Sequence, residues 1–383
     1  MTKSHITAVA LATAIASRAA AQQPQTQPAD TALRVTAINA PAVPLSNEKA
    51  SAKINRFSFV AYGDTRNSHD GTVPQEVHGL VVDAILAKSA ELASGPDPLR
   101  FVVSSGDAVV NGQRVDMLNV SFVPLINRLT AAGLPYFFTA GNHDVTGAPA
   151  IGTPQRAVGL ANLLAAHKNL IPPEGSPRRL TGYPTYAFGY GNTFVVGFDS
   201  NIAGDSTQYR WVKSQLESLD RKRFVNIVMV FHHPVFSSGP HGGANVESAT
   251  IALRTMYMPL FRTHHVRLLI TGHEHLFEHW IERYRDASGA HRIDEIVSGG
   301  GGAPLYDFSS EPDLTGYLAN GAAAHVAVDH LVKPAADTTG NPHHYVVVHV
   351  DGEKLGVEVF GVAWGSAFAP YPGGVLKIPA PKK

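Results

Sequence analysis

Short apolar runs recur along this chain from Phe57 onwards, and many are followed by a longer segment with the pattern of a helix. The runs cover residues 57–62, 101–104, 136–139, 193–198, 227–231, 266–270, 295–297, 345–350 and 355–362. Several are apolar throughout, which is typical of strands covered on both faces. Helices are expected near residues 75–93, 114–132, 154–167, 206–221 and 248–264. Strands and helices alternate in the first half and strands predominate in the second, so we expect an α/β domain.

The residues that follow five of these runs can bind metal ions. They are Asp64, Asp107, Asn142 with His143 and Asp144, His232 with His233, and His273 with His275. Each group comes at the carboxyl end of a predicted strand, where open α/β sheets bind their ligands. Alternate residues of an extended segment face the same way, so His273 and His275 can reach one cavity. Two carboxylates, one amide oxygen and three imidazoles suit two divalent or trivalent cations.

The amino-acid composition limits which metal ligands the chain can offer and which partners it can bind. Cysteine is absent from the 383 residues, which excludes disulfides, thiolate metal sites, iron–sulfur clusters and a cysteine nucleophile. A bound metal would therefore use His, Asp, Glu or Asn, which suit Fe, Mn, Zn or Mg. The chain carries 31 basic and 31 acidic residues, so its formal net charge is zero. Because nucleic-acid-binding proteins usually present an excess of positive charge, no nucleic-acid partner is expected.

The first 21 residues have the features of a secretory signal peptide. Lys3 is followed by an apolar stretch over residues 6–16, and Ala19-Ala20-Ala21 precedes Gln22. We expect cleavage near Ala21 and a periplasmic or secreted protein. The stretch is too short for a permanent anchor, and no later stretch approaches about 18 uninterrupted apolar residues, so no stable membrane insertion is expected.

The rest of the chain divides into three parts. Residues 22–55 are rich in Gln, Pro, Ala, Thr and Ser without periodicity, and we expect a disordered arm. Residues 56–365 are expected to form one catalytic domain, and residues 366–383 a C-terminal tail. Within the domain, Asp351-Gly352 predicts a hairpin turn. The glycines of 298–302 lack the Lys-Ser/Thr and the helix of a P-loop, so they predict a tight structural loop beside the site.

In their order, these motifs resemble the calcineurin-like metallophosphoesterase superfamily, whose pattern is Asp-x-His, Gly-Asp, Gly-Asn-His-Asp/Glu, His and Gly-His-x-His. The resemblance covers about residues 56–365 and is nearest to the catalytic domain of the purple acid phosphatases. It implies a four-layer α/β/β/α sandwich with two central mixed β-sheets. It also implies a two-metal centre at the strand ends, in which iron is paired with Fe, Mn or Zn.

The resemblance implies a role for each motif residue. One metal ion would be bound by Asp64, Asp107 and His275, and the other by Asp107, Asn142, His232 and His273, with Asp107 bridging. In His232-His233-Pro234 the first histidine matches the ligand. A hydroxide bridging the metals would attack phosphorus. His143 would contact the phosphate and protonate the leaving alkoxide, with Asp144 orienting its ring.

The first motif departs from the family pattern. Arg66 stands where most members have a ligand His, and a guanidinium cannot bind a metal ion. The Tyr that purple acid phosphatases use instead corresponds to Val110. Solvent could complete this metal's shell, or His69 or His78 could replace the missing ligand. Arg66 itself could clamp a phosphate or form a salt bridge with a nearby carboxylate.

The expected function is metal-dependent hydrolysis of phosphate monoesters, with a small-molecule phosphate ester as the substrate. His241 lies nine residues after His232, where purple acid phosphatases have a substrate-contacting His, and it is either a phosphate contact or a solvated loop residue. One alternative function is a phosphodiesterase that acts on cyclic nucleotides or lipid headgroups. The other is a non-catalytic metal-binding relative. The ligand motifs do not separate a monoesterase from a diesterase.

Overall fold

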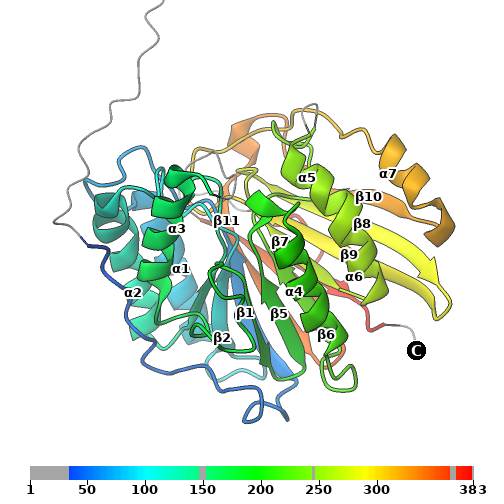
Figure 1. The fold of residues 1–383 in the computed structure, drawn as a ribbon, viewed down its shortest axis with the longest axis horizontal. Coiled ribbons are helices and arrows are strands. Elements are labelled where there is room, and N and C mark those ends of the chain that lie inside the picture. Colours follow the sequence, from blue (N-terminus) through cyan, green and yellow to red (C-terminus); the bar gives the residue numbers. More distant parts are fainter. Residues whose placement is uncertain (1–33, 146–151, 244–245, 363–367, 382–383) are drawn as a thin grey trace, which may run out of the picture. The chain divides into compact units, whose positions relative to one another are not determined.

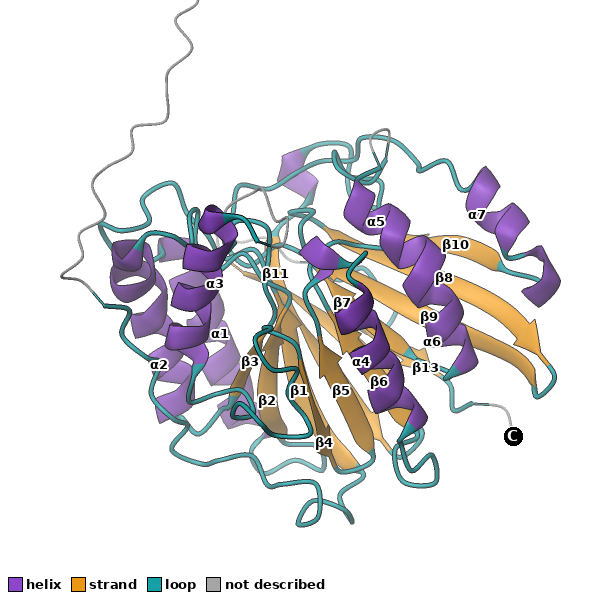
Figure 2. Ribbon diagram, viewed as in Figure 1, coloured by secondary structure: helices purple, strands orange, loops and turns teal. Residues whose placement is uncertain are grey.

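The computed structural model describes residues 34–145, 152–243, 246–362 and 368–381. The expected signal peptide lies outside these residues and stays a prediction, as does the expected location of the protein. In the described part, two β-sheets lie face to face with helices on their outer faces (Figures 1 and 2). None of the described helices is both long and apolar enough to cross a membrane.

Within the described residues, the first sheet has six strands in the order β13-β12-β11-β1-β2-β3. They are β1 (Arg56–Tyr62), β2 (Leu99–Ser104), β3 (Tyr136–Phe138), β11 (His343–Asp351), β12 (Lys354–Val362) and β13 (Val375–Ile378). β1, β2 and β3 run parallel, whereas β11, β12 and β13 pair antiparallel with their neighbours. The parallel strands are buried almost throughout, as their apolar sequence predicts.

The second sheet has seven described strands in the order β10-β8-β9-β7-β6-β5-β4. They are β4 (Tyr186–Tyr190), β5 (Thr193–Gly197), β6 (Asn226–Val230), β7 (Leu268–Thr271), β8 (Phe277–Asp286), β9 (Gly289–Ser298) and β10 (Ala327–Val332). β5, β6, β7 and β9 run parallel, and β4, β8 and β10 pair antiparallel. Both sheets are therefore mixed.

Helices cover the outer face of each sheet (Figure 2). α1 (Glu76–Leu92), α2 (Val123–Ala131) and α3 (Pro154–His167) pack on the first sheet, and α4 (Ser206–Glu217), α5 (Ser248–Ala252) and α6 (Met258–Thr263) on the second. The short α7 (Thr315–Asn320) follows β9 in the chain. Wider helical turns precede α2 and α6, where Pro124 and Pro259 lack the N–H that a regular α-helix would use.

Three apolar clusters fill the interfaces between these layers. Along β1, Val60 packs toward the helices of the first sheet, whereas Phe59 packs between the two sheets. Along β6, Val228 belongs to the cluster between the sheets, and Met229 belongs to the cluster under α4 and α6. Three interfaces require four layers, so the expected α/β/β/α sandwich with two central mixed sheets is confirmed.

The nine expected strands and five expected helices are all present, with ends shifted by a few residues. The predicted hairpin joins β11 to β12, with Gly352 at φ 61°. The loop 298–302 has the structural role that we predicted, since the Gly301 amide donates to the carbonyl of Gly63 at the end of β1. The sequence did not predict β4, β8, β10 or β13.

Two boundaries differ from the expected ones. Of the expected disordered arm over residues 22–55, residues 22–33 lie outside the described part, and residues 34–55 are ordered. Ile38 is fully buried, its amide donates to Ala166, and the Ala42 amide donates to Thr130. Hydrogen bonds from the Thr36 amide to Asn119 and from the Asn39 amide to Asn127 also hold the segment on the domain. The domain also extends beyond residue 365, since β13 pairs with β12 and Tyr371 is buried.

Candidate metal centre

The carboxyl ends of five strands bring the expected ligands together. β1 leads to Asp64, β2 to Asp107, β3 to Asn142, β6 to His232, and β7 to His273 and His275. β1, β2 and β3 are parallel neighbours in one sheet, and β6 and β7 in the other. The two sets of strand ends meet where the sheets face each other. Ligand atoms of Asp64, Asp107 and His232 lie within 4.8 Å of one another.

Asn142, His232 and His273 form one compact group of ligand atoms. Asn142 Oδ1 lies 2.8 Å from His232 Nε2 and 3.1 Å from His273 Nδ1. The two imidazole nitrogens are 3.1 Å apart. Asp107 Oδ1 is 3.6 Å from His232 Nε2. These four residues are the set that the family resemblance implied for one metal ion.

The other nitrogen of each imidazole shows where its proton lies. His232 Nδ1 is 2.9 Å from the carbonyl oxygen of Ser105, and His273 Nε2 is 3.0 Å from a carboxylate oxygen of Glu247. Burial lowers the pKa of both histidines, so each ring is neutral and has a single N–H. Because the acceptors take these protons, the two nitrogens that face each other both carry lone pairs. Lone pairs at this distance repel, and a cation between them would relieve the repulsion.

Asp64, Asp107 and His275 lie on the other side of the centre. His275 Nδ1 is 2.6 Å from the carbonyl oxygen of Pro304, which leaves its Nε2 facing Asp64 Oδ1 at 3.7 Å. Burial, and next the Asp107 carboxylate, raise the pKa of Asp64. Two buried carboxylates that disfavour each other's charge attract a cation.

Arg66 is placed inside this second group. Its Nε lies 3.4 Å from Asp107 Oδ2, and its Nη2 lies 3.3 Å from His275 Nε2. Of the two roles left open by the sequence, the structure contains the salt bridge, and the partner is the expected bridging ligand. The guanidinium donates to the same nitrogen that a metal ion would need. In the same position, the positively charged Arg66 guanidinium could also contact an anion bound at the centre.

The backbone around the ligands is unusual. Asp64, Asp107 and His273 have φ values of 59°, 56° and 69°, in the left-handed region that few residues other than glycine adopt. A Cβ on Gly272 would come within 2.2 Å of Asp64 Oδ2, and one on Gly141 within 2.1 Å of Asp107 Oδ1. The motif glycines therefore let the backbone approach the ligand carboxylates. Such local strain is characteristic of functional sites.

His143 faces the centre, but Asp144 does not orient it as expected. His143 Nε2 is 4.0 Å from Asp107 Oδ2, and its Nδ1 is 2.8 Å from the carbonyl oxygen of Val110. Both oxygens of Asp144 accept backbone N–H groups, from Asp107, Ala108 and Gly141. Asp144 therefore links the loop that carries Asp107 to the loop that carries Asn142. Hydrogen bonds from backbone amides to an ionised carboxylate are strong, so they stabilise both loops.

His241 lies beside the proposed ligands, with its ring centre 4.6 Å from that of His273. Its amide donates to Glu274 Oε1 at 2.8 Å, and its Nδ1 is 3.4 Å from Glu274 Oε2. The side-chain hydrogen bond to Glu274 raises the pKa of His241, so the ring stays cationic to a higher pH than an ordinary histidine. The structure thus places an imidazole with a raised pKa beside the expected ligands, where the sequence left a phosphate contact and a solvated residue as alternatives.

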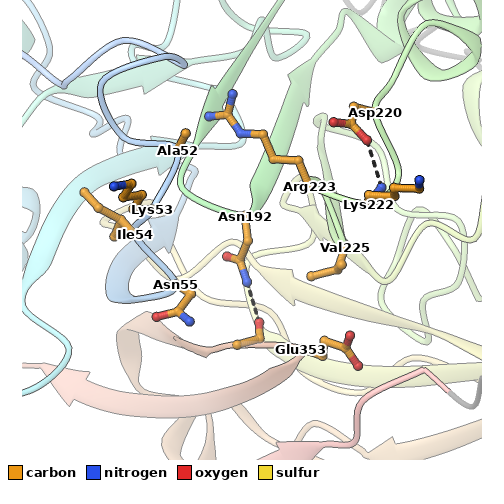
Figure 3. A pocket seen from close by; sticks show the side chains of 11 residues that line it. Ala52, Lys53, Ile54, Asn55, Asn192, Asp220, Lys222, Arg223, Val225 and Glu353 are labelled. Atoms are coloured by element: carbon orange, nitrogen blue, oxygen red, sulfur yellow. Dashed lines mark hydrogen bonds between the residues drawn. The ribbon is translucent and has the colours of Figure 1, made fainter.

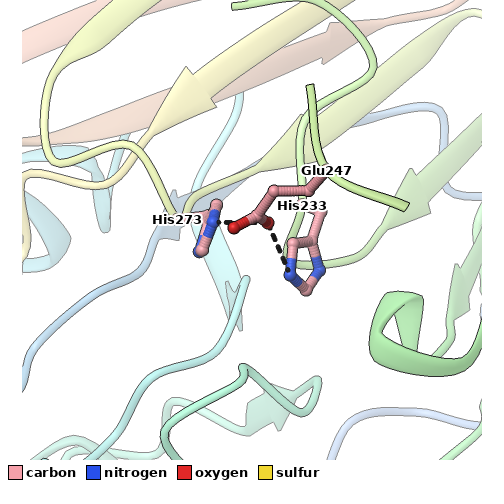
Figure 4. A group of neighbouring side chains, drawn as sticks. All are labelled: His233, Glu247 and His273. Atoms are coloured by element: carbon pink, nitrogen blue, oxygen red, sulfur yellow. Dashed lines mark hydrogen bonds and ion pairs between the residues drawn. The ribbon is translucent and has the colours of Figure 1, made fainter. Parts of the chain in front are cut away.

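Glu247 and His233 belong to the site but were not predicted as functional residues (Figure 4). The Glu247 carboxylate lies 3.0 Å from His273 Nε2 and 3.5 Å from His233 Nε2. His233 Nδ1 is 2.9 Å from the Ser200 hydroxyl, so of the two adjacent histidines it is His232, and not His233, that contacts Asn142. A carboxylate on the far nitrogen of a ligand histidine fixes its tautomer and orientation. No motif marks Glu247 in the sequence.

The two histidines suggested as replacement ligands are elsewhere. His78 is buried, with Nε2 3.0 Å from the Tyr62 hydroxyl and Nδ1 2.8 Å from Gln75 Oε1. His69 is exposed, and its ring nitrogen is near Ser68. Neither contacts the expected ligands in the described structure, so solvent is the remaining alternative for completing that coordination shell.

A separate pocket of about 540 Å³ lies at the amino ends of the strands (Figure 3). It is lined by residues that precede β1, β5 and β6 and by the turn between β11 and β12, including Asn55, Asn192, Val225 and Glu353. Asn192 donates to the carbonyl oxygen of Gly352 there. None of the expected site residues lines this pocket, so we do not assign the chemistry to it.

Comparisons with known proteins agree with the motifs. A family model described as calcineurin-like phosphoesterase matches residues 77–277, just over half of the chain. A stretch of 147 residues is 29% identical to purple acid phosphatase 1 of Ipomoea batatas, and it covers 38% of this chain and 28% of that protein. A stretch of 157 residues is 26% identical to Fe(3+)-Zn(2+) purple acid phosphatase 12 of Arabidopsis thaliana, covering 38% and 29%.

Among solved structures, purple acid phosphatase PPD1 from yellow lupin (Lupinus luteus) seeds superposes with a TM-score of 0.55 at 17% sequence identity. The match covers 80% of this chain and 51% of the lupin chain. This similarity supports the fold. The matched segments span less than a third of the two curated relatives and about half of the lupin protein.

Proposed function

The chain belongs to the calcineurin-like phosphoesterase family, and on this premise we propose that it hydrolyses phosphate monoesters with the help of two bound metal ions. The proposed ligands are Asp64, Asp107, Asn142, His232, His273 and His275, with Asp107 shared. Iron would be paired with Fe, Mn or Zn, since imidazole and carboxylate ligands suit these metals. The substrate would be a small-molecule phosphate ester.

One observation carries the metal-binding part of this proposal. His232 Nε2 and His273 Nδ1 face each other at 3.1 Å while their rings donate from the opposite nitrogens. A hydrogen bond cannot join two acceptors, whereas a metal ion can accept both lone pairs. Asn142 Oδ1 lies next to both nitrogens.

When bound, two such ions would supply a deprotonated water as nucleophile near neutral pH and offset the charge of the transferring phosphoryl group. The chain's own residues would bind the substrate and donate a proton to the leaving oxygen. His143 Nδ1 donates to Val110, so Nε2 can protonate a leaving oxygen only when the ring is cationic. Arg66, and His241 when its ring is protonated, would offer positive charge to the substrate phosphate.

Hydrolysis of 4-nitrophenyl phosphate and of bis(4-nitrophenyl) phosphate, measured side by side, tests this function. We expect kcat/KM for the monoester to exceed that for the diester by at least about tenfold, which is about 1.4 kcal/mol of transition-state discrimination. A chelator should abolish both activities, and Fe with Zn or Mn should restore them. A preference for the diester would support the phosphodiesterase instead. Absence of turnover by metal-loaded protein would favour a non-catalytic relative.

Replacing Arg66 with His is expected to strengthen binding of the metal held by Asp64 and His275, by about 10-fold or more. The variant removes the guanidinium that donates to His275 Nε2 and offers an imidazole in its place. Metal affinity would be measured by competition with a chelator of known strength. Arg66→Gln is the matched control, because it removes the charge and offers only an amide oxygen, a weaker ligand for these metals than an imidazole.

The two variants separate the possible roles of Arg66. If the guanidinium also contacts the substrate, both variants should raise KM. Metal affinity should be higher in Arg66→His than in Arg66→Gln. Equal metal affinity in the wild type and both variants would contradict the competition between Arg66 and the metal.

A further inference from the structure

A second cluster of metal-binding side chains lies at the tip of the hairpin formed by β8 and β9. Asp286 ends β8, His291 lies near the start of β9, and His265 comes from the turn between α6 and β7. The ten residues of β8 separate Asp286 from the metal centre. At about 3.3 Å per residue this strand spans roughly 30 Å, so the two sites are independent.

Both histidines direct the same nitrogen to one carboxylate. His265 Nε2 lies 2.7 Å from Asp286 Oδ2, and His291 Nε2 lies 3.0 Å from Asp286 Oδ1. The ligand atoms of the three residues all lie within 4.8 Å of one another. In a tetrahedral site with bonds of about 2.0–2.1 Å, neighbouring ligand atoms are about 3.3 Å apart, so small side-chain rotations would admit an ion.

The surrounding structure holds these side chains in place. The rings of His265 and His291 are stacked with centres 4.2 Å apart and planes at 13°, and Tyr284 packs against His291 at 5.2 Å. Both Nε2 atoms are therefore already directed toward Asp286, and each ring would turn out of the stack so that its in-plane lone pair meets the ion. His265 and Asp286 are partly exposed, with side-chain accessibilities of 37% and 36%. Solvent can therefore reach the ion and complete its shell.

From this geometry we infer that His265, Asp286 and His291 bind one divalent transition-metal ion of the zinc class, outside the phosphoesterase centre. Two imidazoles and one carboxylate are a ligand set that zinc uses in proteins. The ion would connect the turn after α6 to the hairpin tip and so stabilise the second sheet against unfolding. This site shares no residue with the proposed active centre, so it does not depend on the proposed function.

The rival explanation is a hydrogen-bonded cluster without metal. Ser288 supports it, since its hydroxyl donates to Asp286 Oδ1 at 2.6 Å and lies 2.9 Å from His291 Nε2. The hydrogen bond from Ser288, followed by that from His265, lowers the pKa of Asp286, so the carboxylate is charged in either case. The two explanations differ in whether added metal binds here.

Calorimetric titration of the full-length, metal-loaded protein with Zn²⁺ distinguishes them. The wild type is compared with the His265→Gln/His291→Gln double variant and with Asp286→Asn, which keeps a side chain of the same shape at the turn. We expect the wild type to bind one more equivalent of Zn²⁺ than either variant, and its Tm to rise on saturation by a few degrees more. His69→Gln, which changes an exposed histidine elsewhere, should behave as the wild type.

Phosphatase activity of the metal-loaded variants should match that of the wild type. Equal zinc stoichiometry in the wild type and in both variants would overturn the metal site and leave the hydrogen-bonded cluster. Because the readout is binding and not turnover, this outcome would be distinct from a failure of the proposed function.

Discussion

Replacing Asp107 with Asn is expected to remove both metal ions from the active centre and to lower kcat by about 10³-fold or more, equivalent to about 4 kcal/mol. Asp107 is the carboxylate that we propose for both ligand groups: Oδ1 is 3.6 Å from His232 Nε2, while Oδ2 is 3.4 Å from Arg66 Nε, in the group of Asp64 and His275. An amide keeps the shape and the oxygen that accepts the His143 amide, but it removes the bridging charge. Elemental analysis after dialysis and steady-state rates would measure the two effects.

Asp64→Asn is the matched control for the bridging role. Asp64 is the proposed ligand of one ion only, so this variant should retain about one equivalent of metal, while Asp107→Asn retains less. Circular dichroism and thermal unfolding would verify that both variants keep the fold. Two retained equivalents in Asp107→Asn would contradict the bridge.

Much of the site could be predicted because its ligands follow apolar strands. The strands before Asp64, Asp107 and His232 are buried on both faces, so their sequences are continuous apolar runs with clear ends. The polar residue after each run then marks the carboxyl edge of the sheet. Order along the chain and position at the edge indicated which side chains gather, and the family resemblance implied the two sheets and the two ligand sets.

β8 shows why part of the fold could not be predicted. It contains the buried Glu278 and Glu282, two charged residues that interrupt the apolar pattern by which the other strands were predicted. In the structure Glu278 accepts the Ser238 amide at 2.8 Å, and Glu282 pairs with Arg262 at 3.0 Å. These hydrogen-bonding partners lie far away in the sequence, in a loop and a helix. The residue pattern of the strand alone therefore cannot predict that the two glutamates are buried.

The same limit applies to Asp144 and Glu247. The family resemblance implied that Asp144 orients the His143 ring, yet its oxygens accept hydrogen bonds from the backbone amides of Asp107, Ala108 and Gly141. Glu247 reaches His273 from the segment before α5, without a recognisable motif. Motifs therefore indicated which residues gather at the centre, while the contacts that orient them depend on how separate loops pack.

Replacing His143 with Gln is expected to lower kcat for an alkyl phosphate by about 10²–10⁴-fold while both metal ions remain bound. The His143 ring is held by the Val110 carbonyl and lies 4.0 Å from Asp107 Oδ2, so its removal does not remove a proposed ligand. Its backbone amide, which donates to Asp107 Oδ1, is kept in the variant. What is lost is a nitrogen that can give a proton to the leaving oxygen.

The size of the loss should depend on the leaving group. 4-Nitrophenolate leaves without much help from an acid, whereas an alkoxide needs protonation, so the variant should lose much less activity on 4-nitrophenyl phosphate than on glycerol phosphate. His69→Gln, at an exposed position away from the centre, should leave both rates and the metal content unchanged. An equal loss on the two substrates would instead assign His143 to binding of the phosphate group, because a contact with the phosphate is made whatever group departs.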